Sequence, residues 1–226
     1  MIPANPDRRV VTVWSDVSCP TTALALHVLR ARAADRGTPL LLDHRAHPAE
    51  LVDRRPVPRA VVDAESAALA VGRPELGWRP WPGPPDTYPV TMLLALEAVQ
   101  AAKSPACGGL PGSAQLDAAL RRALLVEGRC ISLYPVVVDV ARDCPLLNLS
   151  PLLDALTAGT GRARVMAQWA TAVRAGVGGG PHLYTAGARA EHGVGTTVHW
   201  LAGPGVGRPE VRDEGDAWAD RLLDAL

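Results

Sequence analysis

One cysteine of this chain stands where a strand gives way to a helix. Residues 10–14, Val-Val-Thr-Val-Trp, are apolar and largely β-branched, which is typical of a buried strand. Cys19 follows, and Pro20 occupies the first position of a helix predicted over 20–34. Unpaired backbone N–H groups and the positive end of the helix dipole favour an anion at such a position. Cys19 is therefore predicted to react as a thiolate nucleophile, although a free cysteine can also be an inert buried thiol.

A second informative segment lies about 160 residues further along the chain. Residues 176–184 read Gly-Val-Gly-Gly-Gly-Pro-His-Leu-Tyr, a glycine-rich approach to a proline that opens a short strand. This pattern is a candidate for a cis X-Pro turn at Gly180–Pro181. Neither this segment nor the cysteine turn is decisive without the other.

Together and in this order, the two segments resemble the DsbA-like branch of the thioredoxin superfamily, which includes FrnE-type proteins and 2-hydroxychromene-2-carboxylate isomerases. Residues 119–132 are similar to the family's helix ending in an acidic-Gly-x-x-Ile-Ser turn, and residues 40–45 to its second strand. The resemblance covers roughly residues 8–226. It implies an α/β protein with a thioredoxin-like fold and an inserted all-helical domain. Pro181 and the Gly180 backbone would return beside the cysteine and align a thiol substrate.

The sequence departs from that family where the turn should carry its second cysteine. Thr22 stands at this resolving position, and dithiol exchange needs a second thiol to resolve the mixed disulfide. We therefore expect Cys19 to act as a single thiol, with Thr22 donating its hydroxyl to the thiolate. Cys107, Cys130 and Cys144 fall at boundaries of the helical insertion. Their spacing predicts no zinc site, and pairing with Cys19 is the less expected outcome.

Four other residues are predicted around the thiol. Under the resemblance, His182 would project towards Cys19 as a base or ion-pair partner. An orientation away from the thiol is equally compatible with the pattern, because neighbours on a strand alternate faces. Pro20 is predicted to contact substrate, and Arg45 to meet a substrate carboxylate, as basic residues do in related isomerases. Trp81 could form an aromatic wall over the thiol or pin its proline-rich segment to the body; we favour the second.

Composition narrows the class of protein. The chain has 226 residues, 48% hydrophobic and 20% charged, which is ample for a core. Its 23 basic and 23 acidic side chains cancel, so there is no electrostatic case for nucleic acid or an acidic membrane surface, and pairs such as Arg121-Arg122 are interpreted as solvated. The sequence has neither a signal-peptide pattern nor a membrane-spanning run. We expect a cytoplasmic protein that binds a small molecule or small thiol and no metal; a homodimer is left open.

Periodicity divides the chain into three parts. Residues 8–46 form the first part of the thioredoxin-like domain, 47–176 a proline-rich loop and the helical insertion, and 177–226 the second part. The proline-rich stretch is expected to hold a single short helix at 59–70. The other expected elements are strands 10–14 and 40–44, helices 90–102, 113–127, 133–142, 150–158 and 162–175, strands 182–184 and 196–201 paired like a hairpin across the link 187–195, and a last helix at 213–226.

Three functions are compatible with these features. The first is a DsbA-like thiol-dependent oxidoreductase or transferase, in which Cys19 forms a mixed disulfide or activates a low-molecular-weight thiol such as glutathione. The second is a thiol-dependent isomerase or group-transfer enzyme acting on a conjugated small molecule, which the loss of the second cysteine favours somewhat, because conjugate addition needs one nucleophile. The third is a binding protein that kept the fold without the reaction.

Overall fold

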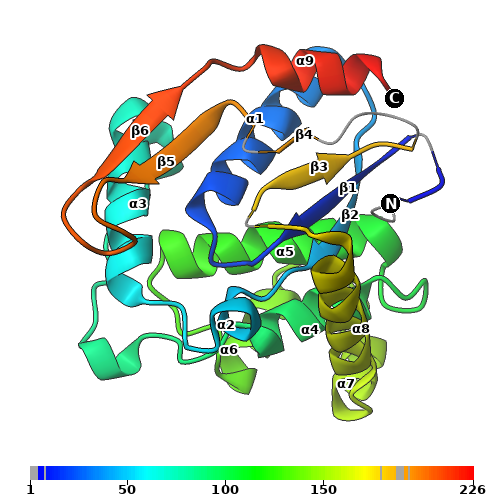
Figure 1. Ribbon diagram of the computed structural model, residues 1–226. Coiled ribbons are helices and arrows are strands. Elements are labelled where there is room, and N and C mark those ends of the chain that lie inside the picture. Colours follow the sequence, from blue (N-terminus) through cyan, green and yellow to red (C-terminus); the bar gives the residue numbers. More distant parts are fainter. Residues whose placement is uncertain (1–4, 8, 179, 187–190, 193) are drawn as a thin grey trace.

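A computed structural model describes residues 5–7, 9–178, 180–186, 191–192 and 194–226. Its main sheet has four strands in the order β2-β1-β3-β4 (Figure 1). The strands are β1 (Val10–Ser15), β2 (Leu41–Ala46), β3 (His182–Tyr184) and β4 (Glu191–His192). Strand β1 runs parallel to β2 and antiparallel to β3, so segments from the two ends of the chain meet in the sheet.

The alternation of side chains along β1 builds a core on each face of this sheet. Val11 and Val13 pack with Leu183 against α1 (Pro20–Asp35) and α9 (Ala217–Asp224). Trp14 points to the other face and packs with residues of α8 (Thr160–Ala175). Because β1 is buried on both faces, its end is a fixed platform for the turn that leads to Cys19.

The helical insertion packs around a second buried cluster, which also includes Val17, Ala23 and Ala46 from the thioredoxin-like part. The insertion comprises α2 (Ala49–Asp53), α3 (Arg59–Gly72), α4 (Leu93–Ala102), α5 (Gly109–Leu125), α6 (Tyr134–Arg142), α7 (Leu149–Thr157) and α8, with short 3-10 helices at Pro74–Leu76 and Pro85–Thr87. Leu116 and Leu120 of α5 are fully buried in that core. The same helix also contacts β2 (Figure 1), so α5 connects the insertion to the sheet.

Two sequence expectations are wrong. Strands 182–184 and 196–201 do not pair: β5 (Thr196–Trp200) pairs with β6 (Pro209–Asp213), a strand that the sequence analysis did not predict. Glycines with positive φ at 203, 205 and 207 turn the chain back between β5 and β6. The proline-rich stretch also holds α2 besides α3, because Pro48 precedes the first turn of α2 and does not interrupt it. Residues 187–190 and 193 of the expected link lie outside the described residues.

None of the helices in the described ranges is both long enough and apolar enough to cross a membrane.

Candidate functional site

The Cys19 thiol lies at the start of α1 in a turn held by an aspartate. Cys19 is the N-cap residue, with φ −72° and ψ 111°, and Pro20 is the first helical residue. The Asp16 carboxylate accepts hydrogen bonds from the backbone and hydroxyl of Ser18, at 2.8 and 2.7 Å. Its second oxygen accepts the Ala49 N–H at 2.9 Å. Asp16 therefore fixes the turn, while the half-buried thiol stays beside the open N-terminus of the helix.

The glycine-rich segment meets this turn. The Gly180–Pro181 peptide bond is cis, and Cys19, Gly180 and Pro181 line one cavity. A Cβ atom on Gly180 would lie 2.9 Å from the hydroxyl oxygen of Thr22, closer than normal packing allows. Glycine thus lets the loop approach α1, and the structure brings these sequence-predicted residues together.

Two cavities open on either side of the thiol. The first, which we call the apolar cavity, has a volume of about 300 Å³ and is lined by residues that include Pro20, Val57, Pro58 and Val61. The second, which we call the polar cavity, has a volume of about 330 Å³ and is lined by residues that include Thr21, Thr196, Thr197 and His199. Cys19, Glu65 and Gly180 line both cavities. A thiol at such a junction can contact two groups of one ligand, or two ligands.

The hydroxyl beside the sulfur is not the one expected. The Oγ1 atom of Thr21 lies 3.1 Å from the sulfur of Cys19, whereas Thr22 Oγ1 is buried and makes no hydrogen bond to any described residue. Successive helical residues point about 100° apart, and Thr22 is directed towards Gly180. The predicted contact of Thr22 with the thiolate is therefore corrected to Thr21.

His182 is not brought to the thiol. It pairs with Trp14 in the sheet register, so its side chain lies on the sheet face covered by α8. Its Nδ1 atom is 3.1 Å from the hydroxyl of Tyr184. Neither cavity beside Cys19 has His182 among its described lining residues. The alternation of side chains along β3 thus decides between the two orientations that the sequence allowed.

Neither Arg45 nor Trp81 is among the described lining residues of the two cavities. Arg45 forms an ion pair with Asp43 at 2.6 Å and lines a separate cavity beside β2, α4 and α8. The backbone N–H of Trp81 donates to Asp63 at 2.8 Å, and its ring packs edge-on against Tyr88. Trp81 is buried in the core of the insertion, so it pins the proline-rich segment to the body.

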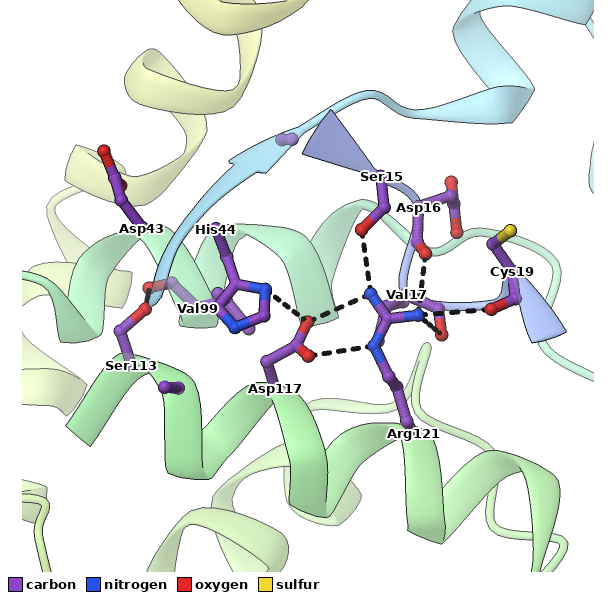
Figure 2. Close-up of polar contacts among 12 residues, drawn as sticks. Ser15, Asp16, Val17, Cys19, Asp43, His44, Val99, Ser113, Asp117 and Arg121 are labelled. Carbon is purple, nitrogen blue, oxygen red and sulfur yellow. Dashed lines mark hydrogen bonds and ion pairs between the residues drawn. The ribbon is translucent and has the colours of Figure 1, made fainter. Parts of the chain in front are cut away.

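Arg121, a buried residue whose role the sequence analysis did not predict, lies directly below the thiol turn (Figure 2). Its Nη1 atom donates to the carbonyl oxygens of Asp16, Val17 and Cys19, at 3.1, 3.3 and 3.3 Å. Arg121 also forms an ion pair with Asp117 at 2.8 Å. The interpretation of Arg121 as solvated is therefore wrong. The signal was the Asp117–Arg121 pair, at i and i+4 on the helix side next to Leu116 and Leu120.

The charges of this cluster compensate one another inside the protein. Burial alone would lower the pKa of Arg121, but Asp117 outweighs it, and Cys19 and Asp16 act in the same direction, so the pKa is raised. Burial opposes ionisation of Asp117, but the Arg121 guanidinium lowers its pKa to about 2. His44 lies 3.5 Å from Asp117, and burial lowers its pKa to about 4, so His44 is neutral at pH 7.

Other side chains near the thiol carried no sequence signal. His47 lines the apolar cavity, and its Nε2 atom is 3.1 Å from the Val177 carbonyl oxygen. Glu65 accepts a hydrogen bond from Trp200 Nε1 at 2.9 Å, and burial raises its pKa. These residues reach the site from β2 and its following loop, from α3 and from β5, which are far apart in the sequence.

No second cysteine lines either cavity among the described residues. Cys107, Cys130 and Cys144 are free thiols of the helical insertion. The described ranges contain no group of three or more His, Cys, Asp or Glu side chains that could hold a metal ion. Cys19 is therefore the one cysteine that lines the two cavities among the described residues.

Comparisons with known proteins define the class of fold. No family model matches the sequence, and no curated protein matches it in a sequence search. Solved structures do match: the chain has a thioredoxin-like α/β fold with a helical insertion, as DsbA-like proteins do.

Three of these structures cover nearly the whole chain. The cytosolic disulfide reductase DsbM from Pseudomonas aeruginosa has a TM-score of 0.60 at 21% identity, over 95% of this chain and 97% of its own. A probable DsbA oxidoreductase from Streptomyces coelicolor has a TM-score of 0.62 at 16% identity, over 96% and 89%. A putative protein disulfide isomerase from Nitrosomonas europaea has a TM-score of 0.57 at 15% identity, over 96% and 97%. At these identities the likeness concerns the fold.

Proposed function

We propose that this protein is a single-cysteine thiol-disulfide oxidoreductase or transferase that works with a low-molecular-weight thiol. The observation that carries the proposal is the half-exposed Cys19 at the start of α1, open to two cavities and beside Gly180–Pro181. The fold it shares with disulfide-exchanging proteins supports this chemistry. One of those neighbours, the Pseudomonas disulfide reductase, also has a structure described as with GSH, at a TM-score of 0.57 and 19% identity.

The proposed reaction needs one protein thiol. The Cys19 thiolate attacks one sulfur of a disulfide R–S–S–R′, forms a Cys19–S–S–R bond and releases R′–S⁻. A second small thiolate, R″–S⁻, then attacks the R sulfur, forms R–S–S–R″ and returns the Cys19 thiolate. The protein sulfur ends each cycle unchanged, and the electrons move between the small thiols and the disulfide. The Thr22 substitution therefore removes dithiol exchange within the turn and leaves this cycle intact.

The surrounding residues have distinct parts in this reaction. The Thr21 hydroxyl, 3.1 Å from the sulfur, can donate to the thiolate. The Arg121 guanidinium, held below by backbone carbonyls and Asp117, places a fixed positive charge under the turn. Gly180 and Pro181 form the edge along which the incoming disulfide would lie. Exchange with small thiols fits a reducing compartment, so we place the protein in the cytoplasm.

A second function is favoured by the apolar cavity. Val57, Pro58 and Val61 offer a surface for an apolar group next to the sulfur. There the Cys19 thiolate could add to a conjugated small molecule, permit rotation about the bond that becomes single, and leave again, which makes the reaction an isomerisation. This cycle has no net oxidation and needs no other thiol.

Thiol–disulfide exchange at Cys19 can be tested by intact-protein mass spectrometry. A variant with Cys107, Cys130 and Cys144 replaced by serine is incubated with hydroxyethyl disulfide, and adducts are measured as intact mass. We expect one mixed disulfide, its release by mercaptoethanol, and neither event after a further Cys19→Ser replacement. The rate should exceed that of a small free thiol by at least about tenfold at pH 7, because the N-terminus of α1 and the Thr21 hydroxyl favour negative charge on the sulfur.

Each other outcome rejects the proposed exchange in a defined way. A rate no faster than that of a free thiol would contradict the proposal and favour a binding protein. Slow exchange combined with rapid, reversible addition of Cys19 to a conjugated enone would favour the isomerase. Cys130→Ser alone, in the otherwise unchanged chain, is the matched control, because Cys130 is a half-buried thiol that is not among the described lining residues of either cavity.

A further inference from the structure

The polar cavity has an unusual balance of charge for a site that would bind an anionic thiol. Among its described lining residues, Glu65 is the only acidic one, and none is a lysine or an arginine. The others offer hydroxyl groups from Thr21, Thr196 and Thr197 and an imidazole from His199. These groups suit a ligand with hydroxyl or amine groups, whereas a carboxylate would face the carboxylate of Glu65.

Glu65 is held in place at the junction of the two cavities. It comes from α3, and Trp200 of β5 donates an indole N–H to its Oε1 atom at 2.9 Å. Partial burial raises the pKa of Glu65, because this carboxylate has lost water and gained one donor in return. A cation or hydroxyl on a ligand would supply a further partner. The hydrogen bond between Trp200 of β5 and Glu65 of α3 therefore fixes the position of the Glu65 carboxylate.

The apolar cavity also has more acidic than basic side chains in its described lining. Its described lining includes the carboxylates of Asp16 and Asp53 besides Glu65, against one guanidinium, that of Arg55. Histidines aside, three carboxylates and one guanidinium give the described lining of the two cavities a formal charge of −2.

Arg121 cannot supply the missing positive charge to a ligand. It is buried below the turn, and all three of its side-chain nitrogens donate hydrogen bonds within the protein. Its charge acts on the thiol turn from below, while the surface that a ligand meets is acidic.

We propose that Glu65 is a specificity residue that selects neutral or cationic thiol compounds at Cys19 and disfavours those that carry carboxylates. This inference rests on the proposed thiol exchange and names its substrate class. Glutathione carries two carboxylates, and the described residues of the polar cavity offer them no cation. A compact thiol with hydroxyl or ammonium groups complements the cavity better, because its donors meet Glu65 and the threonine oxygens.

Three symmetric disulfides of similar length test this selection by charge alone. Cystamine is a dication, hydroxyethyl disulfide is neutral and dithiodipropionate is a dianion. In the variant whose only cysteine is Cys19, the second-order rate of mixed-disulfide formation is measured with each, before and after Glu65→Gln. Rates for mercaptoethanol with the same disulfides correct for their intrinsic reactivity. Comparing the same disulfide across variants removes the effect of the thiolate's own charge.

We expect Glu65→Gln to raise the corrected rate with dithiodipropionate by about threefold, lower that with cystamine by about threefold and leave hydroxyethyl disulfide unchanged. Glu75→Gln is the matched control, because Glu75 is exposed and lines a different cavity, beside His27 and Arg30. About 1 M salt, where screening acts within ~3 Å, should weaken the preference of the unmodified site for cystamine.

The possible failures are separable. If Cys19 reacts with none of the three disulfides faster than a free thiol does, the proposed exchange is rejected, and the inference with it. If Cys19 reacts rapidly but Glu65→Gln changes all three rates equally, or Glu75→Gln has the same effect, exchange stands and selection by Glu65 is rejected. Should Glu65→Gln fail to fold, a salt-independent order of the three rates in the unmodified site would reject the selection.

Discussion

The two sides of the thiol turn are built in opposite ways. On the buried side, α5 of the insertion places Arg121 against three backbone carbonyls and Asp117, so that each charge is matched inside the protein (Figure 2). On the open side, α3 and the β5–β6 hairpin surround two cavities in which carboxylates outnumber cations. The buried side therefore sets the position and charge of the thiol. The open side is left to determine which ligand reaches it.

The largest expected effect comes from breaking the buried side. Arg121→Gln leaves Asp117 as an uncompensated buried carboxylate, and we expect a loss of about 3–5 kcal/mol in the free energy of unfolding. Alkylation of Cys19 by iodoacetamide at pH 7 should slow by about tenfold, because the fixed positive charge below the turn is gone. Urea unfolding and alkylation rates by intact mass measure the two effects.

Three further variants separate charge from packing at this position. Arg121→Lys keeps a positive charge and should retain a faster alkylation rate than Arg121→Gln. The double variant Asp117→Asn/Arg121→Gln removes both charges and should recover much of the stability but not the rate. Arg122→Gln is the control, since Arg122 is exposed and pairs with Glu127 at the surface. A full rate in the folded double variant would show that the thiol does not depend on the buried charge.

A medium-sized loss in the free energy of unfolding is expected when the pH falls, because His44 lies on the same buried side. His44 is held neutral because burial outweighs the attraction of Asp117, and Arg30, Arg121 and Lys103 also oppose its protonation. Its folded pKa of about 4 lies below the ordinary 6.5, so its contribution to stability is complete above pH 6.5 and is lost as the pH falls towards 4. Between these pH values the free energy of unfolding should fall by at most about 1.4 kcal/mol per pH unit through His44.

Replacement of His44 isolates its part of this slope. His44→Asn should flatten the fall in unfolding free energy between pH 6.5 and 4, measured by urea titration at each pH. Burial also lowers the pKa of His47, so this residue contributes to stability with the same sign, and His47→Asn is the comparison variant. Protonation of Asp117 lowers the stability only below about pH 4, because the pKa of this carboxyl is lowered from 3.8 to about 2 in the folded protein. An unchanged slope in His44→Asn would mean that His44 is protonated or solvated in the folded protein.

The open side was partly predictable from the sequence, because its first components are local. A β-branched strand, a cysteine and a proline at N1 place the thiol at the start of α1, and Gly180–Pro181 follows from a glycine-rich approach to a strand. Glu65 and His199 could not be found in this way. They reach the thiol only because α3 packs beside the β5–β6 hairpin, and the sequence assigned β5 to the wrong partner.

The buried side was hidden for a different reason. Arg121 and Arg122 are adjacent and chemically identical, yet one is fully buried and the other exposed. The difference follows from the direction each takes on α5, which depends on how that helix lies against β2 and the thiol turn. A charge pair at i and i+4 beside apolar positions hints at burial, but the carbonyls that satisfy the guanidinium come from residues about a hundred positions away.

The smallest effect is expected at Arg45, and it tests whether the ligand-facing surface ends where the two cavities do. Asp43 also forms an ion pair with Lys103, at 2.5 Å, which does not involve Arg45, and the Arg45 side chain is 28% exposed. We expect less than about 1 kcal/mol of lost stability and no change in the rate of mixed-disulfide formation at Cys19 with any of the three disulfides. A selective loss of rate with dithiodipropionate would mean that Arg45 reaches a carboxylate on the ligand. The open side would then contain a cation from β2. The contrast between a buried side with matched charges and an acidic open side would no longer hold.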